Sequence, residues 1–163
     1  MEKKNLKRLD TSHIERSSYL AEIQVSYKSK QKNKIVISNS EKAFEVLFPL
    51  YDKDTIEYIE QFYLILLNKA NRILGWINLS KGGTGGTIID VKVIYAIALK
   101  ANASGLVVSH NHPSGNLNPS EHDKKITKTI IKAGLLFNIV LLDHIIVSHE
   151  KMYYSFKDEG VLL

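Results

Sequence analysis

The stretch SHNHPSGNLNPSEHD, residues 109–123, decides both the expected fold of this chain and its expected chemistry. The apolar run GLVV precedes it at residues 105–108, and a helical pattern follows it from Glu121 to Ala133. This order predicts a strand, a tight loop stiffened by proline, and a helix. It places His110 at the strand end, His112 in the loop and Asp123 in the first helical turn.

Imidazole and carboxylate groups are the ligands that zinc takes when one coordination position stays open for water. The chain contains no cysteine, so disulfides and thiolate sites are excluded and a metal must use histidine and carboxylate side chains. Simpler explanations exist, because Ser120-x-x-Asp123 is also an N-capping pattern and both histidines could hydrogen-bond within the loop. The joint occurrence of His110, His112 and Asp123 around one strand-loop-helix turn favours a zinc hydrolase site.

Composition and charge divide the chain into two regions. With 163 residues, 44% of them hydrophobic and 24% charged, the chain suits one globular domain with a core. Residues 1–34 hold nine basic and four acidic residues, whereas the remainder holds thirteen of each, so the whole net charge of +5 lies at the N-terminus. We expect a basic N-terminal arm at residues 1–36, which contains a strand at residues 20–27, and a metal-dependent hydrolase domain at residues 37–163. The arm could bind nucleic acid through its phosphates, or it could be a solvated terminus.

Targeting signals give little guidance on location. Residues 1–10 are polar and charged, unlike a secretory signal, and no apolar run approaches the length of a membrane span. We therefore expect a cytoplasmic protein with no membrane partner.

The first part of the hydrolase domain is expected to alternate short strands and helices. Residues 35–37 form a strand, and Ser38 with Glu41 makes a capping box for a helix that ends near Leu47. Residues 52–60 are acidic and could be helical. Residues 62–67 are apolar on both faces, which indicates a central strand.

The middle of the domain continues this pattern. Residues 72–79 form the next strand, and the Gly-rich segment 81–86 forms a connecting loop that lacks the ending of a phosphate-binding loop. Residues 90–103 form a helix whose apolar positions share one face. The expected buried positions are Val93, Ile94, Ile97, Ala98 and Ala101.

The C-terminal part completes a mixed sheet with helices packed on it. The helix after the histidine-rich loop is expected to end at Gly134 as a left-handed cap. Residues 139–147 form a strand on which Asp143 and His144 point to opposite faces, with Asp143 in solvent. His144 is either an ordinary core histidine or a partner of a ligating histidine. Residues 153–156 form a short last strand.

At this point the sequence resembles a known family. His110-x-His112-Pro113 followed by Ser120-x-x-Asp123 resembles the JAMM signature of the JAB/MPN metalloproteases, and the string HNHPSG at residues 110–115 is similar to their bacterial RadC branch. The resemblance covers roughly residues 37–163. Further matching segments are residues 62–68, Arg72, residues 142–147 and residues 154–156.

The resemblance implies an α/β fold, specifically a cytidine-deaminase-like α-β-α sandwich with a mixed sheet. It also implies one catalytic zinc ion per chain, with His110, His112 and Asp123 as its ligands. The family carries a glutamate before a central strand, and Glu60 matches that place better than Glu22 or Glu57 do. A water molecule activated by zinc needs a carboxylate that is not a ligand to accept its proton.

The remaining implications concern catalysis and partners. Ser120 resembles the family residue whose hydroxyl stabilises the oxyanion. We expect a JAMM-type zinc hydrolase, a peptidase or isopeptidase with a peptide or isopeptide substrate; a homodimer is left open. The alternative is a DNA-associated accessory protein with a non-catalytic or vestigial metal site, whose arm binds nucleic acid. Two features depart from the RadC pattern: no helix-hairpin-helix pattern precedes the domain, and residues 91–93 read VKV where the family tends to have Pro-Arg-Glu.

Overall fold

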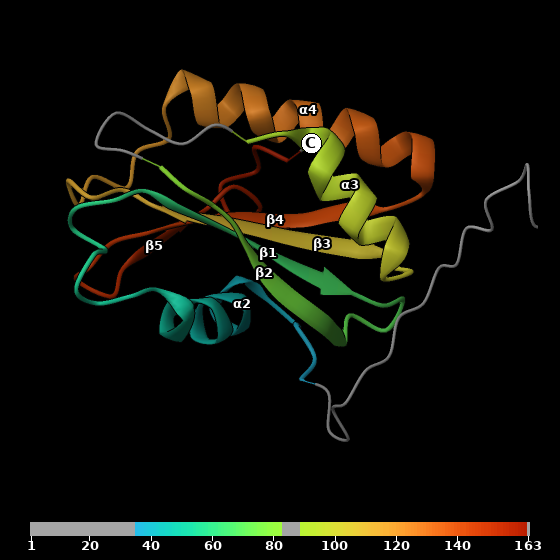
Figure 1. Ribbon diagram of the computed structural model, residues 1–163, viewed down its shortest axis with the longest axis horizontal. Helices are drawn as coiled ribbons and strands as arrows, with labels where there is room; N and C mark the ends of the chain where they lie inside the picture. Colours follow the sequence, from blue (N-terminus) through green and yellow to red (C-terminus); the bar gives the residue numbers. More distant parts are fainter. Residues whose placement is uncertain (1–34, 83–88, 163) are drawn as a thin grey trace, which may run out of the picture.

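The computed structural model describes residues 35–82 and 89–162. The expected basic arm and its strand at residues 20–27 lie outside the described residues, as does most of the Gly-rich loop. The described part is built on one five-stranded sheet with the order β2-β1-β3-β4-β5 (Figure 1). Its strands are β1 (Gln61–Leu67), β2 (Ile73–Lys81), β3 (Gly105–Asn111), β4 (Val140–Val147) and β5 (Tyr153–Ser155).

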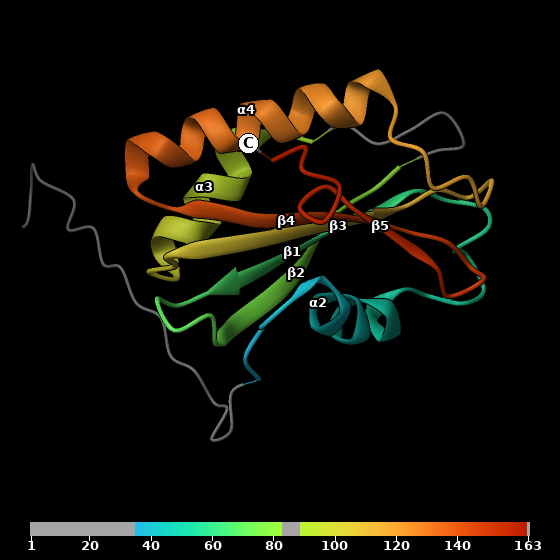
Figure 2. The ribbon, with the colours of Figure 1, turned by 180° about the vertical axis from the view of Figure 1, so that it is seen from behind.

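Helices cover both faces of the sheet. Helix α2 (Ser40–Leu47) lies on one face and is followed by the 3-10 turn η1 (Phe48–Leu50), whereas α3 (Val91–Lys100) and α4 (Glu121–Phe137) lie on the other face (Figures 1 and 2). The expected α-β-α sandwich is therefore confirmed. No helix in the two described ranges is long and apolar enough to cross a bilayer.

Strand β3 holds the centre of the sheet and is buried along its whole length. It runs antiparallel to β1 and parallel to β4, which makes the sheet mixed. A parallel connection needs a crossover, and α4 supplies it between β3 and β4. Because α2 and the pair α3 and α4 cover opposite faces, neighbouring residues of β1 and β3 enter two different cores. This explains why both strands are apolar without alternation.

The region before β1 differs from the expectation in three places. The N-cap of α2 is Asn39 rather than Ser38, since its side-chain oxygen accepts a 2.8 Å hydrogen bond from Lys42 N. Residues 35–37 contribute one isolated bridge, between Val36 and Arg72, instead of a strand. Residues 52–60 form successive turns rather than a helix. Their acidic composition is compatible with helix, but these residues bury few side chains that could stabilise one.

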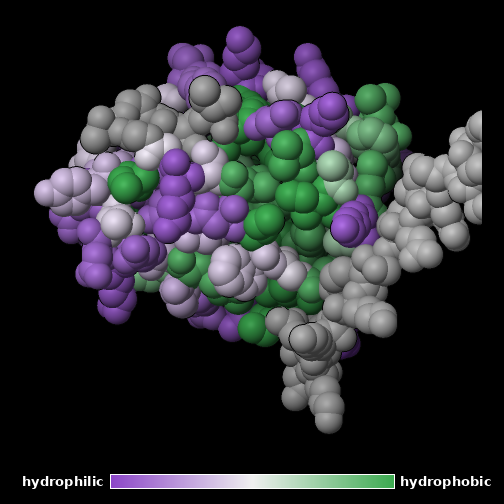
Figure 3. Space-filling view, viewed as in Figure 1, coloured by the Kyte–Doolittle hydropathy of each residue, from purple (hydrophilic) through white to green (hydrophobic). Residues whose placement is uncertain are grey.

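Helix α3 buries a narrower stripe than its apolar spacing suggests. Of the five expected positions, Ile94, Ala98 and Ala101 are buried and Ile97 is half-buried, whereas Val93 is 44% exposed. The stripe is set by contact with α4, because the Tyr95 hydroxyl donates a 2.6 Å hydrogen bond to the carbonyl of Ile130. Apolar side chains therefore remain at the surface over α3 and the end of α4 (Figure 3), among them Leu99, which is 50% exposed.

The expectation that α4 ends at Gly134 is wrong. The helix continues to Phe137, and Asn138 takes the left-handed conformation, with a φ of 54°. Gly134 lies inside the helix. The residue is a glycine because a Cβ atom there would come within 2.3 Å of the Ile139 carbonyl oxygen. The glycine thus permits close approach of the chain as it turns into β4, rather than a positive φ.

Candidate metal centre

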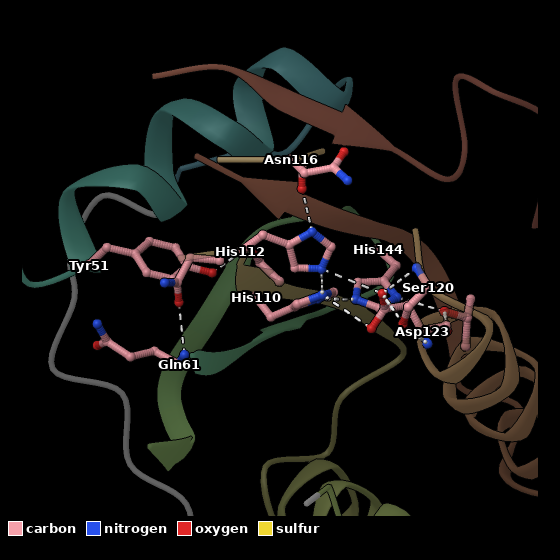
Figure 4. A network of polar contacts seen from close by, with 11 residues as sticks. Tyr51, Gln61, His110, His112, Asn116, Ser120, Asp123 and His144 are labelled. Atoms are coloured by element: carbon pink, nitrogen blue, oxygen red, sulfur yellow. Dashed lines mark hydrogen bonds and ion pairs between the residues drawn. The ribbon is translucent and has the colours of Figure 1, made fainter. Parts of the chain in front are cut away.

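Three elements bring His110, His112 and Asp123 to one place. His110 is the penultimate residue of β3 and is buried, with Phe62 of β1 and Ile146 of β4 as its partners in the sheet. His112 follows the strand end, and its backbone N–H donates to the carbonyl of Val147. Asp123 is the third residue of α4 and points back toward both histidines (Figure 4).

The distances between the three side chains suit a single ion. The Nε2 atom of His110 lies 3.0 Å from Nε2 of His112 and 3.2 Å from Oδ1 of Asp123. The Nε2 atom of His112 lies 3.5 Å from Oδ2 of Asp123. Ligand atoms that surround one zinc ion tetrahedrally at its usual bond lengths are separated by roughly 3.3 Å. These residues could therefore hold a metal ion in the place that the sequence predicts.

The start of α4 serves helix capping and the site together. Asp123 Oδ2 accepts hydrogen bonds from the backbone N–H and the hydroxyl of Ser120, at 2.7 and 2.6 Å. Ser120 Oγ in turn accepts from Asp123 N, which completes a capping box. Oδ1 is left facing His110. Oδ2, which caps the helix, also lies 3.5 Å from Nε2 of His112. One carboxylate thus accommodates both the capping explanation and the metal explanation of this pattern.

Electrostatics keep the Asp123 carboxylate ionised. Burial by itself would raise the pKa of Asp123, but the adjacent His110 and His112 rings and the hydrogen bond from Ser120 outweigh it and hold that pKa well below its usual range. The helix N-terminus also favours an ionised carboxylate at this position. An ionised carboxylate beside two imidazoles is the form that a metal ligand set requires.

Glu60 lies beside the cluster at the residue preceding β1. Burial raises the pKa of the Glu60 carboxyl; the nearby His110 ring opposes this rise, and the charge of Asp123 adds to it. Glu60 is half-buried, while the weaker candidate Glu57 is exposed and Glu22 lies outside the described residues. The catalytic roles of Glu60 and Ser120 stay predictions.

Asp143 and His144 lie on opposite faces of β4, but the expected solvation of Asp143 is wrong. Asp143 is buried and accepts hydrogen bonds from the Ser155 hydroxyl and from Lys157 N, at 2.7 and 3.1 Å. The Asp143 side chain is covered by β5 and the turn after it, and β5 pairs antiparallel with β4. No local pattern of β4 could have revealed this burial.

On the other face, His144 contacts the predicted ligands directly. Its Nε2 atom lies 2.9 Å from Nδ1 of His110 (Figure 4). Its Nδ1 atom lies 2.6 Å from Oγ1 of Thr127. The ring stacks on Phe156, with centroids 4.6 Å apart and planes at 10°. Burial lowers the pKa of His144 well below its ordinary value. His144 is therefore a neutral hydrogen-bond partner of His110, which is a predicted ligand.

Two residues of this site were missed in the sequence, Thr127 and Asn111. Thr127 lies one helical turn after Asp123 and is buried, so its spacing of four residues could have marked it. Asn111 stands between the two histidines and is also buried. Its side chain accepts from Gln61 N and donates to the carbonyls of Ile56 and Ile59. No sequence pattern pointed to that link with the segment before β1.

Comparison with known proteins gives one family. A model described as "RadC-like JAB domain" matches residues 37–161. The chain is 43% identical over 125 residues to a UPF0758 protein of Flavobacterium johnsoniae, covering 77% of this chain and 53% of that one. It is 41% identical over 103 residues to a UPF0758 protein of Porphyromonas gingivalis, covering 63% of this chain and 45% of that protein. For a UPF0758 protein of Aquifex aeolicus the identity is 37% over 131 residues, with 80% and 54% covered. The chain spans about half the length of these curated relatives.

Proposed function

Since this chain belongs to the RadC-like JAB domain family, we propose that it is a JAMM-type zinc hydrolase that cleaves a peptide or isopeptide bond. The observation that carries the proposal is the convergence of His110, His112 and Asp123 within the spacing of one coordination sphere, with a half-buried Glu60 beside them. The first three side chains suit ligands, and the fourth suits a proton acceptor that is not a ligand.

The donor set supports zinc as the metal. Two imidazoles and one carboxylate form the open type of zinc site, and no thiolate is available in this chain to favour softer ions. Zinc bound there would polarise the scissile carbonyl and lower the pKa of a bound water to about 7.

Glu60 has the position and the environment of a general base. In the proposed reaction its carboxylate accepts a proton from the attacking water and returns it to the leaving amine as the C–N bond breaks. A carboxylate of raised pKa holds a proton more readily, which suits both steps. The backbone carbonyl of Glu60 accepts a 2.9 Å hydrogen bond from Gly82 N, which ties the residue to the end of β2.

Ser120 is proposed to donate a hydrogen bond to the substrate carbonyl oxygen as negative charge develops on it. Its hydroxyl hydrogen is directed at Asp123 Oδ2 in the structure. The proposed role therefore requires Ser120 to exchange one hydrogen bond for another during the reaction. Asp123 Oδ2 would keep the backbone N–H of Ser120 as a donor.

The test is a screen of the zinc-loaded chain against peptide and isopeptide libraries, with three variants beside it. Glu60→Gln should bind zinc normally and lose activity by roughly 10²-fold or more. Glu57→Gln, an exposed glutamate three residues earlier, is the matched control and should stay active. His110→Ala should lose both zinc and activity. Equal activity in wild type and Glu60→Gln, or a chain that takes up no zinc, would overturn the proposal.

The rival function is nucleic-acid binding through the basic arm. It is supported by the net charge of +5 that lies within residues 1–34. It predicts binding that falls steeply with added salt and survives Glu60→Gln. A gel-shift titration of wild type and Glu60→Gln at two salt concentrations tests for this binding separately from peptidase activity.

A further inference from the structure

Three hydrogen bonds run in series behind His110, on the side of the ring away from the metal site. They join His110 Nδ1 to His144 Nε2 at 2.9 Å, His144 Nδ1 to Thr127 Oγ1 at 2.6 Å, and Thr127 Oγ1 to the Asp123 carbonyl oxygen at 2.6 Å. His110 and His144 are buried between elements of the sheet and α4, and Thr127 is buried with them. The series thus begins at one predicted ligand and ends on the backbone of another.

The direction of each bond follows from the end of the series. A carbonyl oxygen can only accept, so the single hydroxyl hydrogen of Thr127 is donated to Asp123. Thr127 Oγ1 must then accept from His144, which puts the ring hydrogen of His144 on Nδ1. A neutral imidazole has one N–H, so Nε2 of His144 accepts, and the hydrogen between the two rings belongs to His110 Nδ1.

We infer that Thr127 and His144 are positioning residues that fix the tautomer of His110, so that its Nε2 lone pair is presented to the metal. The inference rests on the proposed metal site. It assigns to this site two residues that do not touch the ion and that act through His110.

The second histidine shows the same outcome by a shorter route. His112 Nδ1 lies within hydrogen-bond distance of the carbonyl oxygen of Asn116, which can only accept. In its neutral form His112 therefore also carries its hydrogen on Nδ1, which leaves the Nε2 lone pair for a metal. Nε2 of His110 lies 3.2 Å from Oδ1 of Asp123, Nε2 of His112 lies 3.5 Å from Oδ2, and the two Nε2 atoms lie 3.0 Å apart. A cation bound among these atoms would stabilise this arrangement of lone pairs.

Aromatic packing holds the ring planes of the series. Phe156 stacks on His144 with the ring centroids 4.6 Å apart. Phe62 lies nearly parallel to His110, with the centroids 6.1 Å apart and an angle of 11° between the ring planes. Rings held in this way cannot rotate to offer a carbon atom to their partner without disturbing their packing on Phe62 and Phe156. With the ring planes fixed, the hydrogen-bond series determines which tautomer His110 adopts.

The substitution that isolates the series is Thr127→Val, which keeps the shape of the side chain and removes its hydroxyl. His144 then has no acceptor at Nδ1, so its hydrogen is expected to move to Nε2 and to displace the hydrogen of His110 from Nδ1 to Nε2. Zinc affinity should fall about 10- to 100-fold. Thr127→Ser keeps the hydroxyl and should restore the wild-type affinity. Thr129→Val is the matched control, because Thr129 makes the same bond to a helix carbonyl, that of Lys125, but is exposed.

Two measurements decide the inference. Competition titration with a chromogenic chelator gives the zinc affinity, and long-range ¹H–¹⁵N correlation spectra of the metal-free protein give the tautomer of each ring. We expect His110 protonated at Nδ1 in the metal-free wild type and at Nε2 in Thr127→Val. Protonation at Nε2 in the metal-free wild type overturns the inference without any variant, as does an unchanged zinc affinity in Thr127→Val. A wild type with the expected tautomer that binds no zinc would instead remove the proposed function and leave the hydrogen-bond series intact.

Discussion

The side-chain oxygen of Asn111 accepts a 2.8 Å hydrogen bond from the backbone N–H of Gln61, fifty residues earlier in the chain. The same side chain donates to the carbonyls of Ile56 and Ile59, at 2.6 and 3.0 Å. The residue between the two predicted histidine ligands therefore fixes the segment that carries Glu60. Together with the pairing of β1 and β3, this amide holds the proposed base near the predicted metal site.

Replacing Asn111 should loosen that link. Asn111→Ala leaves the Gln61 N–H and two carbonyls without their partner in a buried place, so we expect the free energy of unfolding to fall by about 3 kcal/mol. Zinc binding should be retained, because His110 and His112 keep their own contacts. Urea unfolding followed by circular dichroism measures the loss. Asn118→Ala, at an exposed asparagine of the same loop, serves as control; equal stability of the two variants would contradict the assigned role.

Zinc content should depend on Asp123 and not on its acidic neighbour. We expect about one zinc per chain in the wild type and almost none in Asp123→Ala, because two imidazoles alone do not complete the site. Glu121→Gln removes an exposed carboxylate from the same helical turn and should keep the metal. Elemental analysis of freshly purified and of zinc-dialysed protein checks this. Comparable zinc content in the Asp123 and Glu121 variants would place the metal elsewhere.

Gly134 should tolerate no side chain. Alanine favours a helix interior over glycine by about 1 kcal/mol, but a Cβ atom at Gly134 would lie 2.3 Å from the Ile139 carbonyl oxygen and 2.8 Å from the Tyr95 hydroxyl. We expect Gly134→Ala to lower the free energy of unfolding by about 2 kcal/mol. Gly75→Ala is the comparison, since a Cβ there meets nothing within 4 Å. Thermal melts of both variants give the answer, and a stabilised Gly134→Ala would show that the turn into β4 relaxes freely.

Ionisation of the Tyr95 phenol should lower the free energy of unfolding at high pH. Burial raises the pKa of its phenol from 10.0 to about 12. The folded state therefore holds the proton more tightly than the unfolded state does. This contribution is fully present below about pH 10, and it is lost as the pH rises through about 12. Tyr95→Phe should reduce the decline in the free energy of unfolding over that window, measured by urea unfolding at several pH values. Tyr58→Phe, at a ring that is 71% exposed, is the control, and an unchanged decline in Tyr95→Phe would assign the effect to other groups.

Local patterns predicted the elements around the site well. The strand ending at Asn111, the loop and the capped helix beginning at Glu121 all lie where residues 105–133 indicated them. The errors fall where a helix end or cap is decided by packing. The N-cap is Asn39 rather than Ser38, and the next residue, Ser40, is buried and bonded to Asp158 at 2.9 Å. Helix α4 continues past Gly134, which packs closely against Ile139, and ends at the left-handed Asn138.

The sequence by itself determined the family, the mixed α/β sandwich and the set His110, His112 and Asp123, because these depend on residue types and spacings within one short stretch. Only the tertiary structure decided which residues lie behind and beside that set. Strand pairing places His144 behind His110, and the docking of α4 adds Thr127 to it. Pairing of β1 with β3 brings Glu60 and Asn111 together. The physical reason is that side-chain periodicity specifies which face of an element is buried but carries no information on the register between elements.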